Sequence, residues 1–188
     1  MRTLTKFFIA AAMLVPAAAQ ASGWHSYRNA QMGFAMSYPD GWQIDTGHLY
    51  TAMGPGKDIH GVAFKVRKSF TIGTNLSDDS YFAVEILPGV KQCRAALFLD
   101  DAIDKPRIKS GNNGLQWEVL DGADQGAGNS YEETVQAVVG SQPCIATRAF
   151  AHSTNVGNYD PGTVKEFNRR AFNATIDKMR RSFRLLPR

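Results

Sequence analysis

The sequence predicts an α+β fold, in which a mostly antiparallel sheet is followed by one long C-terminal helix. Short runs rich in aromatic and β-branched residues alternate with glycine- and proline-containing turns, which is the pattern of short strands. A single long amphipathic helical pattern runs from Val164 to Phe183. Strand patterns and the long helical pattern are thus segregated along the chain, and this order is typical of α+β domains.

The first half of the chain is predicted to consist of strands joined by tight turns. Asn29–Gly33 supplies a turn after the first aromatic strand, and Pro39-Asp40-Gly41 supplies the next. The polar segment Thr71–Ser80 is expected to be a loop, and Pro88-Gly89 ends the strand that follows it. The strands predicted in this half are Trp24–Asn29, Phe34–Tyr38, Trp42–Asp45, Leu49–Met53, Val62–Val66 and Tyr81–Leu87.

The middle of the chain is predicted to contain a short helix and a run of hairpins. Ala95, Ala96, Leu97 and Phe98 favour a helix over Lys91–Asp101. The glycine-rich segment Gly122–Asn129 is expected to be a mobile loop between two strands, and Gly140–Pro143 a shorter one. The strands predicted here are Pro106–Ser110, Leu115–Leu120, Tyr131–Val139 and Cys144–Ala151.

The C-terminal helix is the most clearly patterned element. Thr163 and Glu166 have the spacing of a capping box, which predicts that the helix starts there. A broad apolar arc formed by Phe167, Phe172, Ile176 and Met179 should cover one face of the sheet. We expect the arginines of the opposite arc, Arg169, Arg180 and Arg181, to be exposed, and Ser182–Leu186 to leave the helix as an extended tail.

The N-terminus predicts export. Arg2 and Lys6 precede a 13-residue apolar run, and Ala19-Gln20-Ala21 forms a small-x-small cleavage site. The run is shorter than the roughly 20 residues of a transmembrane helix. We therefore expect residues 1–21 to be a signal peptide of bacterial type, residues 22–188 to form a single globular domain, and the protein to be periplasmic or secreted. A retained N-terminal anchor is the alternative.

Composition narrows the class of partner. Apolar residues make up 44% of the chain, enough for an ordinary core, and the formal net charge is +4. Arg2 and Lys6 contribute two of these charges, so the mature domain is close to neutral. The balance gives no general electrostatic argument for nucleic acid as a partner.

Two cysteines, Cys93 and Cys144, are predicted to form a disulfide, because an even count in an oxidising compartment favours pairing. We expect Cys93 to lie at or just before the short helix, and Cys144 to lie at the start of a late strand. Closing a loop of this length contributes up to about 4 kcal/mol by restricting the unfolded chain. Two buried free thiols are the alternative.

Both ends of the sequence carry motifs of a known family. Tyr27-Arg28-Asn29 followed by Gly33-Phe34-Ala35-Met36-Ser37-Tyr38-Pro39-Asp40-Gly41-Trp42 resembles the opening of PsbP-like domains. The strand Cys144–His152, the loop with Asn158-Tyr159-Asp160 and the closing Ser182-Phe183 resemble their C-terminal part. The resemblance covers the middle of the chain loosely. It implies an α/β/α sandwich around an antiparallel sheet, and roles that are mostly non-enzymatic binding or assembly. The chain departs from the photosynthetic members in having a simple export signal.

Motifs of catalysis and of cofactor binding are missing from the sequence. There is no G-x-S-x-G, H-E-x-x-H, C-x-x-C or Walker pattern. His48 and His60 flank the Gly54–Asp58 loop, and ordinary surface histidines are favoured there over a zinc pair. Asp78-Asp79 and Asp100-Asp101-x-x-Asp104 could bind calcium, but they lack the ligand count and the glycine of a calcium loop, so solvated acids or charges at a helix end are favoured. No catalytic, metal or cofactor residue is predicted.

Positive charge is concentrated at the C-terminus. From Lys165 to Arg188 there are eight basic residues against Glu166 and Asp177. A solvated helix face, with cations favoured near the helix C-terminus, is the preferred interpretation. The alternative is contact with an anionic lipid surface or an acidic partner. The residues available for that contact are Arg169, Arg170, Arg180, Arg181 and Arg184.

These observations favour an exported, non-enzymatic factor that binds an unknown envelope protein or assists its assembly. Two other classes stay open. One is a binding module for a small molecule or an anionic lipid. The other is an enzyme such as a hydrolase, whose acid–base residues are brought together by the fold without a readable motif.

Overall fold

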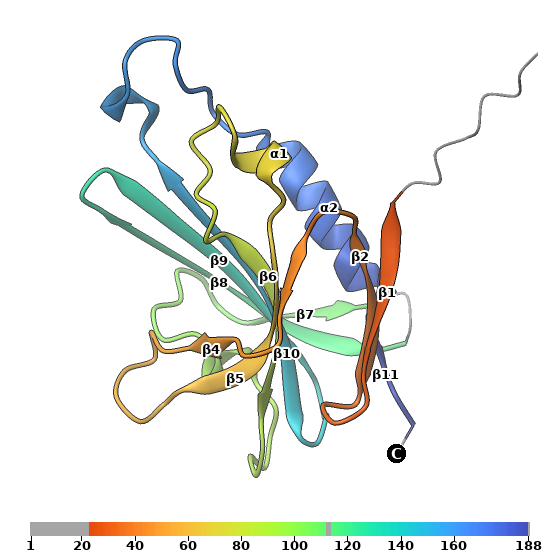
Figure 1. Cartoon of the computed structure of the whole chain (residues 1–188). Coiled ribbons are helices and arrows are strands. Elements are labelled where there is room, and N and C mark those ends of the chain that lie inside the picture. The colour runs from red at the N-terminus through yellow and green to blue at the C-terminus, as the bar shows by residue number, and fades with distance from the viewer. Residues whose placement is uncertain (1–22, 112–113, 188) are drawn as a thin grey trace, which may run out of the picture.

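A computed structural model describes residues 23–111 and 114–187. The fold is mostly antiparallel β, with two α-helices, of which the C-terminal one is long (Figure 1). The predicted signal peptide, residues 1–21, lies outside the described residues. The strands are β1 (Trp24–Asn29), β2 (Phe34–Pro39), β3 (Gln43–Asp45), β4 (Leu49–Tyr50), β5 (Ile59–Lys65), β6 (Tyr81–Leu87), β7 (Arg107–Ser110), β8 (Gln116–Gly126), β9 (Asn129–Val138), β10 (Cys144–Thr154) and β11 (Arg184–Leu185). The helices are α1 (Lys68–Thr71) and α2 (Arg169–Ser182), with 3-10 turns η1 (Ala95–Leu97) and η2 (Val156–Asn158).

The strands form two sheets. The larger has the order β3-β5-β6-β10-β9-β8-β7, with β4 pairing to β5, and all of its pairs are antiparallel. The smaller has the order β1-β2-β11. The C-terminal β11 therefore pairs with β2 from the start of the chain, which brings both ends of the described chain to one side of the larger sheet (Figure 1).

One face of the larger sheet is covered by α2 and by the smaller sheet (Figure 1). Phe172, Ile176 and Met179 of α2 and Phe34 of β2 are almost fully buried there, as the helical periodicity predicts. The core contributed by the sheet itself to this side is aromatic and β-branched, with Val62, Phe64, Phe82, Val84, Trp117 and Val119. This continuous apolar layer is the main core of the domain.

The opposite face is covered only in part. The segment that contains Cys93, Ala95, Phe98 and Leu99 packs over the first halves of β8 and β10 and the second half of β9. Tyr50 and Met53 from the β4 region join it. A three-residue 3-10 turn stands where the resemblance to PsbP-like domains implied a second helical layer. Toward the end of β10 and the start of β6, the described segments leave this face open, and the residues around α1 stand only at its edge.

The predicted helix over Lys91–Asp101 is wrong beyond η1, and the contacts of the segment explain why. Cys93 and Cys144 form a disulfide, with their Cα atoms 4.9 Å apart, and the Ala95 amide donates to Glu118 Oε1 at 3.0 Å. The disulfide and this hydrogen bond fix the backbone at the start of η1 to the sheet, so that only Ala95–Leu97 are helical. The disulfide is the expected pairing, and Cys144 begins β10 as the sequence suggested.

The predicted loop over Gly122–Asn129 is also wrong. β8 continues to Gly126 and β9 begins at Asn129, so that a two-residue turn, Ala127-Gly128, closes the hairpin. Both turn residues have positive φ, 50° and 79°, as the tight hairpin turn requires. Gly122 lies within β8. Leu99 packs so closely against it that a Cβ at this position would lie 2.9 Å from Leu99 Cδ1, which explains a glycine inside a strand.

The helix α2 begins at Arg169 and not at the predicted capping box. Asn168 is the N-cap, and its Oδ1 accepts from the Ala171 amide at 2.9 Å. The preceding residues pair with the loop before β6, since Lys165 N donates to Gly73 O and Phe167 N donates to Asn75 Oδ1. Tertiary hydrogen bonds thus take the backbone groups that a first helical turn would have used.

The described residues contain no helix that is long and apolar enough to cross a membrane. They do contain the Cys93–Cys144 disulfide, a bond that persists in oxidising compartments and is rare in the cytosol. The disulfide is consistent with a protein that works outside the cytoplasm.

The burial of α2 predicts a stability contrast between two of its residues. Phe172→Ala should lower the free energy of unfolding by about 3–5 kcal/mol, because Phe172 is only 2% exposed and its removal leaves a cavity. Arg181→Ala, on the exposed side, should cost less than about 1 kcal/mol. Urea denaturation followed by fluorescence measures both. Equal midpoints for Phe172→Ala and wild type would contradict the packing of α2 on the sheet.

The disulfide predicts a redox-dependent stability. Reduction should lower the free energy of unfolding by about 2–4 kcal/mol, because the bridge closes a loop with a sequence separation of 51 residues. Denaturation with and without reductant measures this, with a Cys93→Ala/Cys144→Ala variant as the control that should not respond. Two alkylatable thiols in the purified, non-reduced protein would contradict the bridge.

Candidate functional site

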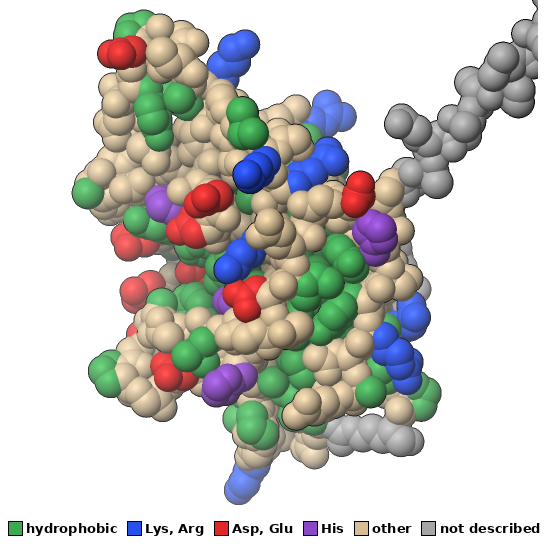
Figure 2. Space-filling model, in the orientation of Figure 1, with side chains coloured by type: hydrophobic (Ala, Val, Ile, Leu, Met, Phe, Trp, Pro, Cys, Tyr) green, Lys and Arg blue, Asp and Glu red, His purple; other side chains and the backbone are tan. Residues whose placement is uncertain are grey.

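The uncovered end of the second sheet face forms an open cleft with a volume of about 1460 Å³. Its walls come from the β3–β4 segment, from the residues around α1 and from the β8–β9 hairpin. Figure 2 shows it as a hollow at the left of the molecule, with acidic side chains along its edge. Because the cover over this face ends at Tyr50, the cleft reaches down to the sheet itself.

A row of stacked rings forms the floor of the cleft. Tyr81 of β6 stacks on Phe150 of β10, its direct cross-strand partner, with ring centroids 5.1 Å apart. Phe150 is followed by Tyr131 of β9 at 6.3 Å, and Tyr131 by His152 at 4.5 Å. His48 continues the row beyond Tyr81 at 4.9 Å. Cross-strand aromatic pairs of this kind stiffen a sheet, so the floor is a preformed apolar surface.

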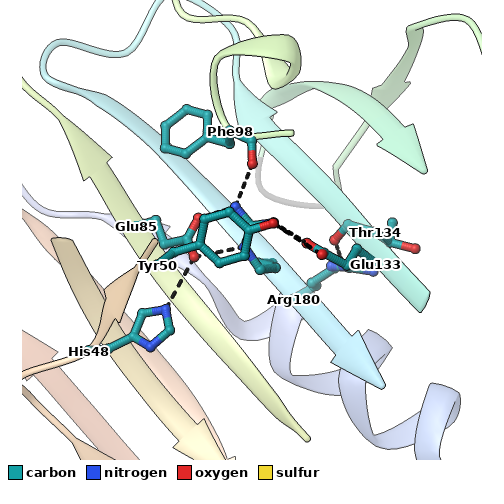
Figure 3. A network of polar contacts seen from close by, with 8 residues as sticks. His48, Tyr50, Glu85, Phe98, Glu133, Thr134 and Arg180 are labelled. Atoms are coloured by element: carbon teal, nitrogen blue, oxygen red, sulfur yellow. Dashed lines mark hydrogen bonds and ion pairs between the residues drawn. The ribbon is translucent and has the colours of Figure 1, made fainter. Parts of the chain in front are cut away.

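A buried ion cluster lies next to the row of rings on the same strands, and Figure 3 shows its members from close by. Arg148 is central in β10 and fully buried. Its Nε donates to Glu85 Oε1 at 2.8 Å, its Nη2 donates to Glu85 Oε2 at 3.0 Å, and its Nη1 pairs with Glu133. Glu85 and Glu133 stand diagonally across from Arg148 on the two neighbouring strands, one on each side.

Three further groups complete the cluster. The Tyr50 ring lies over the Arg148 guanidinium, 3.4 Å from ring centroid to Cζ, and its hydroxyl donates to Glu133 at 3.1 Å. The Phe98 carbonyl accepts from Arg148 Nη2. His48 Nε2 lies 3.2 Å from Glu85 Oε1. The cluster therefore joins β4, β6, β9, β10 and the segment after η1 (Figure 3).

The electrostatics of the cluster favour permanent charges. Burial raises the pKa of Glu85, but attraction to Arg148 and hydrogen bonds from His48 and Arg148 outweigh it, so the pKa of Glu85 is lowered. Burial lowers the pKa of Arg148, and attraction to Glu85 and Glu133 outweighs that effect, so its pKa is raised. Burial also raises the pKa values of Tyr50 and Tyr81. Around neutral pH, Glu85 and Arg148 are therefore charged, and Tyr50 and Tyr81 are neutral.

The rims of the cleft carry both kinds of charge. The basic rim, from the end of β5 to the start of α1, has Lys65, Arg67 and Lys68, and Asp45 lies there too because it pairs with Lys65 at 3.0 Å. The acidic rim consists of Asp78 and Asp79, which precede β6, and Asp124 of β8, and Glu133 is 15% exposed at the floor. A hydrogen bond from Lys65 and one from the Gly47 amide hold the pKa of Asp45 below its ordinary value, against the effect of burial. The cleft thus offers a charged partner one preferred orientation.

The arrangement is poorly suited to acid–base chemistry. Glu85 and Glu133 are both committed to Arg148, and a carboxylate with a lowered pKa is a weak base. His152 at the edge of the floor has both ring nitrogens engaged, Nδ1 with Asp79 at 2.9 Å and Nε2 with Asn129 Oδ1 at 3.1 Å. Within residues 23–111 and 114–187, no group of three or more His, Cys, Asp or Glu side chains is placed to hold a metal ion.

The residues singled out in the sequence lie elsewhere. Arg169 and Arg181 are exposed, as expected. Arg170 of α2 and Arg184 of β11 are exposed too, and all four lie on the opposite face of the larger sheet from the cleft. Arg180 is a correction: it is half-buried, and its Nη2 donates to the Thr134 carbonyl of β9 at 2.9 Å. The long side chain leaves the solvent arc and lies along the helix–sheet boundary. His60 is exposed, whereas the side chain of His48 is only 9% exposed and is not an ordinary surface histidine.

Sequence reasoning missed Arg148, Glu85 and Glu133, although a signal for two of them was present. Arg148 stands within Cys144–Ala151 and Glu85 within Tyr81–Leu87, both otherwise apolar strand patterns. Charged residues at central strand positions are rarely buried unless they are paired. Pairing two of them across strands needs the strand order β6-β10-β9, in which residues far apart in the sequence become neighbours.

The cluster predicts a specific acid sensitivity. Glu85→Gln should lower the free energy of unfolding at pH 7 by about 3–5 kcal/mol, because it removes one partner of a fully buried pair. The pKa of Glu85 is lowered in the fold, so its stabilising effect is complete above its ordinary pKa of 4.5 and is lost as the pH falls through the folded value. Urea denaturation at several pH values should therefore show a steeper acid loss for wild type than for Glu85→Gln. If the free energies of unfolding of wild type and Glu85→Gln fell equally with pH, the lowered pKa of Glu85 would be contradicted.

Comparison with known proteins yields structural matches alone. No protein-family model matches the sequence, and no curated protein matches it. The fold is similar to the solution structure of cyanobacterial PsbP (CyanoP) from Synechocystis sp. PCC 6803, with 12% identity over 92% of this chain and 98% of that chain, at a TM-score of 0.47. It is also similar to a crystal structure from Bacteroides thetaiotaomicron VPI-5482, with 14% identity over 88% of this chain and 49% of that chain, at a TM-score of 0.44. The first match is a PsbP protein, the family that the motifs at both ends of the sequence resemble.

Proposed function

We propose that this protein is an exported, non-enzymatic binding protein, and that its cleft takes a segment of an envelope partner protein. The observation that carries the proposal is the row of rings Tyr81, Phe150 and Tyr131, which lies open at the floor of a charged cleft. Apolar surface bordered by polar residues is typical of interaction sites. The resemblance to PsbP-like domains, whose roles are mostly binding and assembly, motivates the same class.

The size and shape of the cleft favour a polypeptide segment over a small molecule. Small-molecule sites usually enclose about 300–1,000 Å³ and bury most of the ligand. This cleft exceeds that range at about 1460 Å³ and is open along one side (Figure 2). An extended segment can lie across such a floor and place charged side chains against both rims.

Commitment of the polar groups favours binding over catalysis. The carboxylates nearest the floor are held by Arg148 and Tyr50, and the His152 ring is held by Asp79 and Asn129. These contacts fix the shape of the site and leave no general base poised beside a nucleophile among the described residues. The stiff floor reduces the conformational entropy that binding would otherwise cost.

Affinity capture with matched variants tests the proposal. Wild type, Phe150→Ala, Asp124→Arg and Arg170→Glu are immobilised and exposed to envelope extract of the source organism. Phe150→Ala removes a ring from the floor, and Asp124→Arg reverses an exposed charge on the acidic rim. Arg170→Glu reverses an exposed charge on α2, away from the cleft, and serves as the control.

A protein retained by wild type and Arg170→Glu, and bound about tenfold more weakly by both cleft variants, is the expected result. Thermal melts show beforehand that each variant is folded. Retention that depends on Arg170 and not on the cleft would overturn the proposal in favour of the C-terminal basic face. A small molecule that is released on denaturation from wild type alone would contradict a polypeptide ligand. Repeated experiments in which wild type captures no protein would contradict it as well.

A further inference from the structure

A second, smaller pocket lies on the α2 side of the larger sheet, away from the cleft. It is about 230 Å³ in volume and opens between the C-terminal half of α2 and the strands β7, β8 and β9. The side chains that matter here are Lys109, Trp117, Gln136, Asp177, Arg180 and Arg181. The pocket is large enough for a small oxyanion and too small for a metabolite of drug size.

Arg180 is the unusual member of this pocket. Its Nη2 donates to the Thr134 carbonyl of β9 at 2.9 Å, which draws the side chain down from α2 to the sheet (Figure 3). Its Nε is buried and has no hydrogen-bond partner. Its Cζ lies 5.8 Å from the centroid of the Phe82 ring. Buried guanidinium nitrogens are normally satisfied, so a bare Nε calls for an explanation.

Arg180 also lacks a counterion. None of the ion pairs within the described chain includes it. The carboxylates that attract it are Asp177 and Asp121, and Asp121 is engaged by Arg107. Burial lowers the pKa of Arg180 to about 10, and the attraction of those two acids offsets this only in part. At neutral pH the group is therefore a charged guanidinium that has a carbonyl partner, Thr134, but no carboxylate partner within 4 Å among the described residues.

Two further cations face the same pocket. Arg181 follows Arg180 on α2, and Lys109 projects from β7, the edge strand of the larger sheet. Cations at the end of α2 are partly accounted for by the helix dipole. Lys109 is not, because it belongs to a strand. Cations on two separate elements thus converge on a pocket where Asp177 is the one acidic lining residue.

We propose that this pocket binds a phosphate-type oxyanion, with Arg180 as the principal donor and Lys109 and Arg181 at its mouth. Nε is buried, so the terminal Nη nitrogens of Arg180 are the atoms that a ligand in the pocket could reach. Their charge-assisted hydrogen bonds to a phosphate are roughly twice as strong as neutral ones. Gln136 supplies an amide at the same pocket. The phosphate comes either from the free anion or from the headgroup of an anionic lipid, since both present the same oxygens.

Titration with inorganic phosphate tests the proposal, with calorimetry or ³¹P NMR as the readout and sodium chloride at matched ionic strength as the reference. Wild type should show one saturable site. Arg180→Met should weaken phosphate binding at least about tenfold, the loss expected for a charge-assisted pair. Arg170→Met, an exposed arginine of α2 that does not line the pocket, should bind like wild type.

A separate stability measurement distinguishes a binding residue from a structural one. Without phosphate, Arg180→Met should unfold at the same urea concentration as wild type or a higher one, because a half-buried charge without a carboxylate partner has been replaced by an apolar side chain. Phosphate should then raise the midpoint of wild type and not that of the variant. If Arg180→Met fails to fold, Lys109→Gln, an exposed change on β7, should still weaken phosphate binding relative to Arg170→Met.

Vesicles identify the source of the phosphate. Flotation with phosphatidylglycerol vesicles, competed by inorganic phosphate and lost in Arg180→Met, supports the pocket with a lipid ligand. Saturable phosphate binding without flotation supports the pocket with the free anion. No saturable phosphate binding by wild type, or equal weakening by Arg180→Met and Arg170→Met, overturns the proposal and leaves only general attraction to a basic surface.

Discussion

The ion cluster around Arg148 is the constraint on which the rest of this structure depends. A guanidinium at the centre of a sheet is costly to bury, and it is tolerated here because four partners surround it. Those partners come from β4, β6, β9 and the segment after η1, which are separated widely in the sequence. Satisfying one side chain therefore requires the correct strand order and the correct position of two covering segments.

The same cluster decides where the second sheet face is covered and where it is open. On one side of Arg148, the disulfide and the Phe98 segment close over small and apolar residues such as Ala137 and Ala146. On the other side, Tyr50 ends the cover, and the rings of Tyr81, Phe150 and Tyr131 face the cleft. The first face has no such division, because α2 and the smaller sheet place a continuous apolar layer on it. One face thus contributes most of the core, and the other carries the candidate site.

Local pattern predicted much of the fold, and it failed where distant segments compete for backbone groups. β1 and β6 have the bounds that their aromatic patterns predict, and Phe172, Ile176 and Met179 are buried as helical periodicity requires. The helix does not start at the predicted capping box, Thr163, because residues 165–167 form hydrogen bonds with the loop at 73–75. The loop predicted from Gly122 is a strand for a related reason. Glycine within a strand permits the close approach of Leu99, and nothing local distinguishes this from a turn.

The sequence by itself predicted the mostly antiparallel fold with its long C-terminal helix, the cysteine pairing and the amphipathic face of α2, because each depends on periodicity or on a count. Export stays a prediction from a short N-terminal motif. The sequence did not reveal the candidate site. Tyr81, Glu133 and Phe150 lie on three different strands, and they meet only through the order β6-β10-β9. Arg180 has an exposed position on the helical wheel, yet the Thr134 carbonyl of β9 draws it inward. Long-range pairing created both features, and a one-dimensional pattern carries no information on which distant residues become neighbours.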